Sequence, residues 1–367
     1  MVVWAADWNF VAVATTARLW GEGSVTENEA EIGKAENSNR TAWHFHPDLP
    51  IRLAPLYDRP IRIGAIAKYL LGGWSLFGER IYFLLIAIGI WIFFSPSLER
   101  TVTFQFDWIF EIWLRNLILI TIVAGGLHLY LYTFRKQGDD LRYDTRTYPA
   151  KGKAFLFGNQ LWDNMFWSLT SGVAVWTAYE SVFMWVYANG LATMITLEDH
   201  PFWFIALILL TPYWAGFYFF WQHRSLHWPP LFKHIHARHH KNVNLGPWSG
   251  LSQHPVEQIV DQSDCLIFLL IPSHPVHVIF NLLFHGIGAP SSHTGYDAVR
   301  LWGSRRLQIG DFLHQLHHRH FDCNYGTYDM PWDRVFGCFH DGTPEGDRTI
   351  TERRKALRAK ARRKGPR

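Results

Sequence analysis

Runs of apolar residues divide the first 221 residues of this chain into four candidate membrane spans. They extend over about 78–95, 116–134, 165–188 and 202–221. The core of a bilayer requires roughly 20 helical residues, so the first run, whose uninterrupted part is Ile81 to Phe94, is short and the others are long enough. The pattern predicts an all-α integral membrane protein, with about four transmembrane helices in region 71–221.

Basic residues between the runs indicate an orientation. The segment 135–153 carries six Lys and Arg, whereas 189–201 carries acidic residues and neither Lys nor Arg. Because positively charged loops stay on the cytosolic side, we expect the N-terminal region 1–70, the 135–153 loop and everything after Trp221 to be cytosolic. Both termini would then face the cytosol, at the inner membrane of a bacterium or the endoplasmic reticulum of a eukaryote.

Histidine is concentrated behind the last span, where three groups have helical spacing. HRSLH occupies 223–227, HARHH ends at residue 240, and HQLHH occupies 314–318. Residues three and four apart share one face of a helix, so each group can aim its imidazoles at a common point. The eight histidines are His223, His227, His236, His239, His240, His314, His317 and His318.

Eight imidazoles are too many for one closed metal site. Imidazole nitrogen is a good ligand for iron, copper and zinc, and a closed tetrahedral zinc site needs only four ligands. The three groups therefore fit two metal ions, each with an open coordination position. We expect a cytosolic, helical, histidine-rich catalytic cap over residues 222–343.

A fifth apolar stretch, 265–285, lies between the histidine groups and is broken by Pro272 and Pro275. A full crossing by this stretch would put the 314–318 group on the opposite side of the membrane from the other two groups. The shared site would then be destroyed. We therefore expect a re-entrant or interfacial hairpin here.

Four polar residues lie within the apolar stretches. His277 and His285 are candidates to support the metal ligands or face the substrate, with an ordinary structural role as the alternative. His128 is expected to pack or hydrogen-bond rather than bind a metal. Glu180 is an intramembrane carboxylate, a kind of residue that is usually functional or paired, but the sequence shows no partner for it.

The overall composition adds two constraints. The three cysteines, Cys265, Cys323 and Cys338, have no metal-binding or disulfide spacing, which fits a reduced cytosolic face. The net charge of +4 is local, because nine Lys and Arg lie between Arg353 and Arg367, within the basic C-terminal tail, 344–367. This tail is suited to docking an acidic electron carrier or anionic lipid headgroups, or it is unengaged. We expect no nucleic-acid partner.

Several motifs together resemble one known superfamily. They are HRSLH, HARHH and HQLHH, with QHPVE at 253–257, HTGYD at 293–297, NYG at 324–326 and WDRVFG at 332–337. This set is similar to the fatty acid hydroxylase and sterol desaturase superfamily of membrane di-iron oxygenases. The segments NVNLGPWSGLSQHPVE at 242–257 and IPSHPVH at 271–277 are most similar to sterol C-5 desaturases, the lathosterol oxidase type. The resemblance covers roughly residues 216–343.

The resemblance implies roles for individual residues. The eight histidines would be iron ligands, and His293 would be a ninth. His254 would either orient a ligand through a hydrogen bond or cap a helix. Asn324, Tyr325, Trp332 and Asp333 look like a scaffold around the last group, and no separate catalytic acid or base is assigned.

The resemblance also implies a reaction class. Two non-haem iron ions would use O2 as cosubstrate, with electrons from cytochrome b5 or a ferredoxin and its reductase, since the sequence contains no Rossmann or flavin motif. We expect a sterol substrate and a desaturase. The alternative is a hydroxylase acting on a fatty acyl, sphingoid, sterol methyl or ether lipid group. More remote alternatives are a membrane metal transporter or haem protein, which would carry histidines along the spans.

Overall fold

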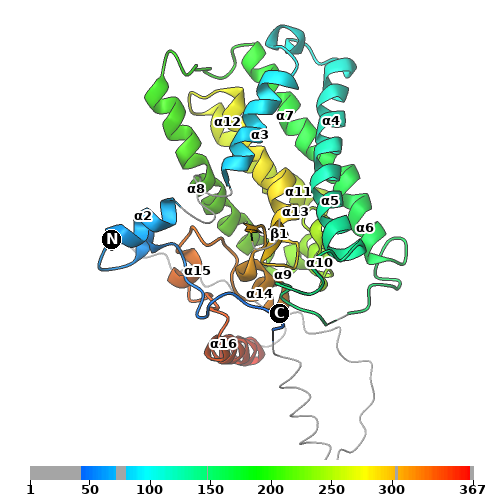
Figure 1. Cartoon of the computed structure of the whole chain (residues 1–367), viewed down its shortest axis with the longest axis vertical. Helices are drawn as coiled ribbons and strands as arrows, with labels where there is room; N and C mark the ends of the chain where they lie inside the picture. The colour runs from blue at the N-terminus through cyan, green and yellow to red at the C-terminus, as the bar shows by residue number, and fades with distance from the viewer. Residues whose placement is uncertain (1–42, 72–79, 147, 302–304, 364–367) are drawn as a thin grey trace, which may run out of the picture.

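The computed structural model describes residues 43–71, 80–146, 148–301 and 305–363, and most of them are helical. Long helices form a bundle, and short helices gather at one end of it (Figure 1). The bundle consists of α3 (Arg80–Phe93), α4 (Phe106–Ile120), α5 (Gly126–His128), α6 (Gln160–Trp167), α7 (Val173–Ala188) and α8 (Pro201–Leu226). Wider π-helical turns at Thr121–Gly125, Leu129–Thr133 and Ser168–Gly172 join or extend α4 to α7, so that 106–133 and 160–188 are each one continuous rod.

Four rods, α3, 106–133, 160–188 and α8, occupy the positions of the four expected spans. The second and third begin earlier in the chain than expected, at residues 106 and 160. The second starts at residue 106 because its polar first turns are held by Arg100, which pairs with Asp107 and Glu111 at 2.9 Å. A search for runs of apolar residues misses such a charged first turn, so the predicted span began too late. Two helices in the described residues, Phe106–Thr133 and Pro201–Leu226, are long and apolar enough to cross a membrane, and α3 is a shorter apolar helix. The expected first span begins at 78–79, outside the described residues.

Glu180 of α7 has a partner that the sequence did not reveal. The guanidinium of Arg115 on α4 forms an ion pair with it, and both side chains are almost fully buried. Asn116 also directs its amide toward the same carboxylate oxygen, at 3.5 Å. Removing one member of a buried pair leaves an uncompensated charge. The pair therefore gives Glu180 a structural role in joining α4 to α7.

The stretch 265–285 enters and leaves the bundle at the same end. It belongs to a helical hairpin of α11 (Pro255–Asp261), a 3-10 segment (Gln262–Leu269), α12 (Pro275–Leu283), a π-helical turn (Phe284–Gly288) and α13 (Ala289–Ser292). At the apex Ser273 donates its N–H to the Thr193 carbonyl and accepts the Ile195 N–H, both at 3.0 Å. Those two residues connect α7 to α8 at the end of the bundle opposite the histidines. The path is that of a hairpin.

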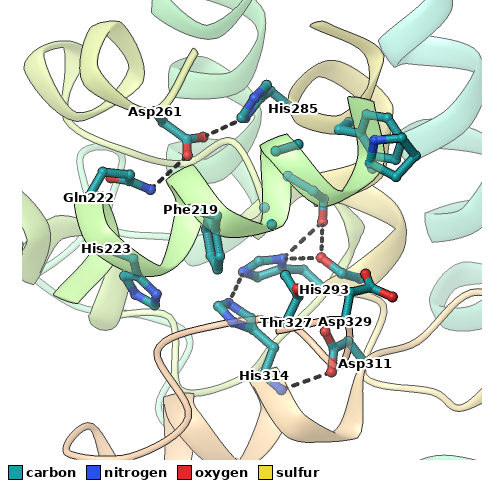
Figure 2. Close-up of a pocket in the computed structure, with 18 of the residues that line it drawn as sticks. Phe219, Gln222, His223, Asp261, His285, His293, Asp311, His314, Thr327 and Asp329 are labelled. Atoms are coloured by element: carbon teal, nitrogen blue, oxygen red, sulfur yellow. Dashed lines mark hydrogen bonds and ion pairs between the residues drawn. The ribbon is translucent and has the colours of Figure 1, made fainter. Parts of the chain in front are cut away.

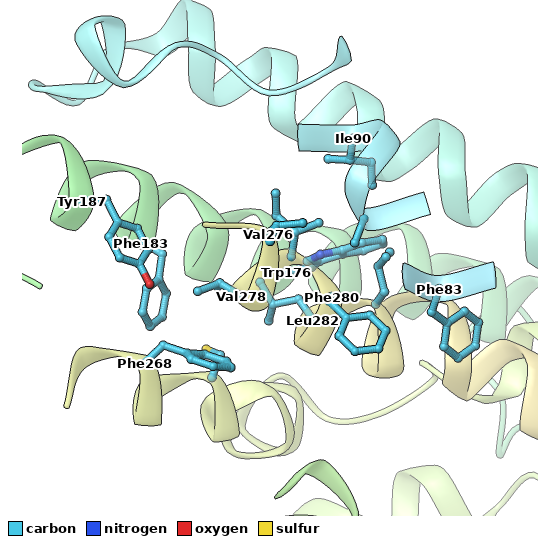
Figure 3. Packing of buried hydrophobic residues seen from close by; sticks show 14 of the residues in the cluster. Phe83, Ile90, Trp176, Phe183, Tyr187, Phe268, Val276, Val278, Phe280 and Leu282 are labelled. Atoms are coloured by element: carbon cyan, nitrogen blue, oxygen red, sulfur yellow. The ribbon is translucent and has the colours of Figure 1, made fainter. Parts of the chain in front are cut away.

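The hairpin is the centre of the main hydrophobic core. Every residue of α12 is buried, and the helix packs against α3, α7 and α8. Phe280 of α12 belongs to this core together with Phe83, Trp176 and Phe183, which are spread along the helix (Figure 3). A Cβ on Gly286 would lie 2.5 Å from the Trp176 ring, so only glycine allows this close approach. This packing fixes the position of the hairpin along the bundle, and with it the position of its two ends near the histidines.

Short elements complete the histidine-bearing end. They are α2 (Ile63–Leu70), α9 (Pro229–Leu231), α10 (Ala237–His240), α14 (Phe312–His320), α15 (Trp332–Val335) and α16 (Pro344–Arg363), with 3-10 turns at Pro55–Tyr57 and Pro247–Ser249 and a π-helical turn at Phe232–His236. Another 3-10 turn, Leu98–Thr101, joins α3 to α4 at the opposite end of the bundle, where Thr101 Oγ1 donates to the Met184 carbonyl at 3.2 Å. Strands β1 (Ala298–Leu301) and β2 (Arg305–Gln308) pair antiparallel, with Ala298 opposite Gln308. The basic tail is helical up to residue 363, and Arg354 anchors it to Asp322 at 2.7 Å.

Candidate metal centre

The structure gathers all nine predicted histidines into two adjacent groups. The first holds His223, His227, His236, His240 and His317, and the second holds His239, His293, His314 and His318. All nine are buried. A third group of possible metal ligands in the described residues lies apart from these two.

The HARHH and HQLHH motifs each contribute histidines to both groups. The outer pair of HARHH enters the first group, whereas the outer pair of HQLHH enters the second. His236 and His240, four residues apart, enter the first group, while His239 between them enters the second. On α14 the i, i+4 pair His314 and His318 enters the second group, while His317 enters the first. Each short helix therefore contributes to both groups, and neither group can form without both helices.

The Nε2 atoms within each group lie at nearly equal short distances. In the first group His227 Nε2 is 3.1 Å from both His236 and His317 Nε2. In the second, His318 Nε2 is 3.0 Å from His239 and 3.1 Å from His314. Two nitrogens bound about 2.1 Å from one metal ion, at right angles, lie about 3.0 Å apart. The spacing is that of atoms sharing an ion.

Hydrogen bonds at Nδ1, on the other side of each ring, show that the short contacts between Nε2 atoms are not hydrogen bonds. His223 Nδ1 lies 2.8 Å from the Tyr325 carbonyl and His317 Nδ1 lies 2.6 Å from that of Cys323. His293 Nδ1 meets a carbonyl at 2.9 Å in the same way. A carbonyl oxygen only accepts, so each Nδ1 carries the hydrogen and each Nε2 keeps a bare lone pair. Converging bare lone pairs repel one another unless a cation lies between them.

Burial keeps the imidazoles neutral. Desolvation lowers the pKa of His236 to about 3 and that of His293 to about 4. The same cause holds the pKa values of His239, His317 and His318 well below the ordinary value. Metal binding requires the neutral ring. The site is therefore ready to bind metal across the physiological pH range, and the residues fit a pair of metal ions.

Glu257 supports the first group, a role that was not predicted from the sequence. His236 Nδ1 donates to its Oε1 at 2.7 Å, and both side chains are buried. A carboxylate in this position fixes the ring orientation and raises the basicity of a metal-binding histidine. Glu257 ends the QHPVE motif, three residues after His254. The sequence therefore offered it, within the same motif, as a second residue that could orient a ligand.

The three candidate supporting histidines have other contacts. His254 caps α11 by accepting the Val256 N–H at 3.2 Å, one of its two expected roles. His277 Nε2 bonds to the Phe204 carbonyl at 3.0 Å. Phe204 precedes His223 by 19 residues, or about 28 Å along α8, so His277 is remote from the centre. The sequence could not place it because the hairpin apex sets its position.

His285 lies closer to the centre but in a separate network. Its ring bonds to Asp261 at 3.2 Å and to Asp264 at 3.0 Å. Asp261 also accepts from Gln222 at 2.9 Å, next to His223 in the chain (Figure 2). His285 thus braces the hairpin beside the centre. His128 stacks on Tyr132 and belongs to neither group, as expected of a packing residue.

A third set of possible ligands, His320, His340 and Asp347, links α14 to α16. His340 Nδ1 accepts the Gly342 N–H at 3.0 Å, so its Nε2 carries the hydrogen and donates to Asp347 at 3.1 Å. That tautomer has no lone pair to offer a metal at Nε2. The set is a hydrogen-bonded brace for α16.

A cavity of about 170 Å³ adjoins both groups. His223, His236, His239, His293 and His314 line its inner end, and Figure 2 shows His223, His293 and His314 there. Toward the bundle its walls are mostly apolar and include Phe83, Pro212, Ala215 and Phe284, with the polar side chains of Gln222, Asp261 and His285 beside them. The histidine centre can therefore reach an apolar molecule held among the long helices.

Comparisons with known proteins match the part of the chain that holds the centre. Residues 204–338 match the family model for fatty acid hydroxylase. The resemblance to this superfamily is confirmed. A Delta(7)-sterol 5(6)-desaturase of Candida albicans is 32% identical over 122 residues, 33% of this chain and 30% of that protein. The Saccharomyces cerevisiae enzyme of the same name is 30% identical over 118 residues, 32% of this chain and 31% of its own.

The similarity to sterol 5(6)-desaturases is partial in length. A relative from Arabidopsis thaliana is 32% identical over 44% of this chain and 59% of its own length. The chain thus matches between about a third and three fifths of these curated relatives. No solved structure matches the chain. The fatty acid hydroxylase match covers all nine histidines of the two groups.

The contact between Glu257 and His236 predicts a loss of metal affinity on mutation. Replacing Glu257 with Ala frees the His236 ring, and we expect metal retention to fall about 10- to 100-fold. Glu257→Gln keeps an acceptor and should lose less. Competition with a chelator on purified protein measures the effect, with Glu352→Ala on α16 as an exposed control. Unchanged retention in Glu257→Ala would show that this contact does not support the metal.

Proposed function

We propose that this chain is an O2-dependent, non-haem di-iron enzyme that introduces a double bond into a sterol, in the manner of a C-5 desaturase. The observation that carries the proposal is the convergence of nine neutral imidazoles in two groups beside an apolar cavity. The similarity to curated sterol 5(6)-desaturases supports the choice of substrate and reaction.

The ligand assignment of this proposal follows the two groups. His223, His227, His236, His240 and His317 would hold one iron, and His239, His293, His314 and His318 the other. When bound, the irons would supply the oxidising power of O2 for removing hydrogen from an unactivated C–H bond. The protein orients the rings through the carbonyls of Tyr325 and Cys323 and through Glu257. It also surrounds the centre with buried side chains that exclude water.

The apolar wall of the cavity supports a lipid substrate. Phe83 comes from α3, Pro212 and Ala215 come from α8, and Phe284 follows α12, so the wall lies among the long helices. An apolar molecule in the bilayer can approach between these helices without crossing water. Its reacting carbon would meet the histidines at the inner end.

A lipid hydroxylase is the alternative, favoured by the name of the matching family. Both reactions would use the same ligands and begin with removal of hydrogen, so their products distinguish them. Desaturation removes two hydrogen atoms from the lipid, whereas hydroxylation adds one oxygen atom. A haem protein fits less well, because Nε2 atoms about 3 Å apart leave no space for a porphyrin between two axial histidines.

The proposal includes a membrane topology and an electron donor. The four rods would cross the bilayer, with the hairpin re-entrant from the cytosolic side and both termini cytosolic. Lys151 and Lys153 are exposed in the segment that leads into α6, and Arg348 is exposed on α16, which lies at the histidine-bearing end of the bundle (Figure 1). Such a surface suits an acidic electron carrier such as cytochrome b5 or a ferredoxin.

Removing one histidine from either group should abolish turnover. We expect His317→Ala in the first group and His239→Ala in the second to form no product, although both proteins still insert in the membrane. His128→Ala is the matched control, since that ring lies outside both groups. Mass analysis of lipids from hosts that express each variant measures the product. Product formation by either group variant would contradict the ligand assignment.

Single cysteines can test the topology without altering the native ones, because Cys265, Cys323 and Cys338 are buried. We expect an impermeant thiol reagent to label Lys151→Cys from the cytosolic side only. Glu198→Cys, in the loop between α7 and α8, and Leu270→Cys, exposed at the hairpin apex, should both react from the opposite side. Labelling of Leu270→Cys from the cytosolic side would contradict the depth proposed for the hairpin.

A further inference from the structure

Two phenylalanine rings connect the first group of histidines to the protein surface. The centroid of the Phe232 ring lies 5.3 Å from that of His227 and 5.5 Å from that of His240. The Phe321 ring lies 4.8 Å from His240. The two phenylalanine rings are 6.5 Å apart, and both residues are only partly buried within the described part of the chain. Each ring therefore contacts a proposed metal ligand and also reaches the surface.

This surface is separate from the apolar cavity. The cavity is lined by five of the nine histidines, namely His223, His236, His239, His293 and His314. His227 and His240, which contact Phe232, are not among the described residues that line it, and neither is Phe232 or Phe321. A partner that binds over the two rings can therefore act on the first group while a lipid occupies the cavity.

Basic side chains flank the two rings. Lys233 follows Phe232 in the chain and is exposed. Beside Phe321, Arg353 and Arg354 of α16 bond to the carbonyl and the carboxylate of the next residue, at 3.2 and 2.7 Å. These neighbours carry three positive charges and one negative charge. We name the two phenylalanines and the three basic residues the entry patch. An apolar centre with a basic rim suits a partner whose own contact surface is acidic.

The proposed reaction needs a partner that supplies electrons. O2 accepts four electrons and four protons as it becomes two waters. Formation of the double bond supplies two of those electrons and two protons from the lipid, so a carrier must supply the other two electrons and solvent the other two protons. A one-electron carrier therefore binds twice in each turnover and is oxidised by one electron each time.

The rings offer such a carrier a short path to the centre. Electron transfer between proteins slows steeply as the separation of their redox groups grows, so a surface ring in contact with a ligand is a favourable place for the carrier to bind. Figure 1 shows α9, α10 and α14 at the histidine-bearing end of the bundle, with α16 beyond them. A carrier that approaches this end from the cytosol would meet the entry patch without crossing lipid.

We propose that the entry patch docks an acidic one-electron carrier protein and that the electrons enter the first group of histidines there. This inference rests on the proposed function and adds to it the place at which the electron donor binds. Encounters between redox proteins are weak and bury little surface, so a small patch with charged edges suits them. Phe232 and Lys233 then act on electron supply, which separates their effects from those of the metal ligands.

The test measures how two carriers bind and reduce the full-length, iron-loaded protein in nanodiscs of phosphatidylcholine. The carriers are the soluble haem domain of a cytochrome b5 and an iron–sulfur ferredoxin, and dithionite serves as a small reductant. We expect Lys233→Glu to weaken carrier binding and slow reduction by the carrier about tenfold at low salt. The difference should shrink as salt rises, because ions screen exposed charges. Reduction by dithionite should be unchanged.

Four further variants separate docking from other effects. Lys233→Arg keeps the charge and should behave as wild type. Lys153→Glu reverses an exposed charge outside the entry patch and should slow the carrier much less than Lys233→Glu. Phe232→Ala removes a ring that touches the first group, so it should lower the reduction rate at saturating carrier without changing carrier affinity, and Phe232→Tyr should restore the rate. The iron content of each variant gives the rate per bound iron.

Each outcome has a distinct meaning. Equal losses in Lys233→Glu and Lys153→Glu, or no loss in Lys233→Glu, would overturn the docking site while leaving the sterol desaturase intact. Reduction of Phe232→Ala at the wild-type rate would overturn the path through the ring. A wild-type protein that neither carrier reduces would overturn the acidic partner.

Two other results distinguish the alternatives. A loss in Lys233→Glu that appears only when phosphatidylserine is added to the nanodiscs would assign the basic rim to lipid headgroups and overturn the docking site. Reduction of wild type by a carrier, with no oxidised sterol formed, would overturn the proposed function and support the entry patch.

Discussion

The convergence of nine uncharged imidazoles on two points is the constraint on which the rest of the structure depends. Lone pairs about 3 Å apart oppose folding unless cations bind among them, so the centre is a source of stability only when metal is present. The sharing of α10 and α14 between both groups makes the constraint stricter. Displacing either short helix disturbs both groups.

The long helices and the hairpin each bring residues to the two groups. α8 delivers His223 at its last turn, while the hairpin delivers Glu257 on its first helix and His293 just after its last. Because the hairpin turns back at Ser273, both of its ends reach the same end of the bundle. The buried Arg115–Glu180 pair and the packing around α12 hold this arrangement. The cavity occupies the space between α8 and the hairpin.

The sequence predicted the parts of this account that depend on local spacing. The i, i+3 and i, i+4 histidines identified the ligand candidates, and the need for one shared site indicated that 265–285 turns back. Spacing alone could not divide the histidines between two groups. His236, His239 and His240 share one helical face, and the group that each of them joins depends on where α14 places His314, His317 and His318. The partner of Glu180 arises from tertiary contacts among distant segments. The remote position of His277 has the same origin.

The most direct test of the central claim is the iron content of purified protein loaded with iron under reducing conditions. The two groups predict about two irons per chain, with coordination dominated by nitrogen in X-ray absorption. One iron per chain, or coordination dominated by oxygen or sulfur, would contradict a centre built from both groups of imidazoles.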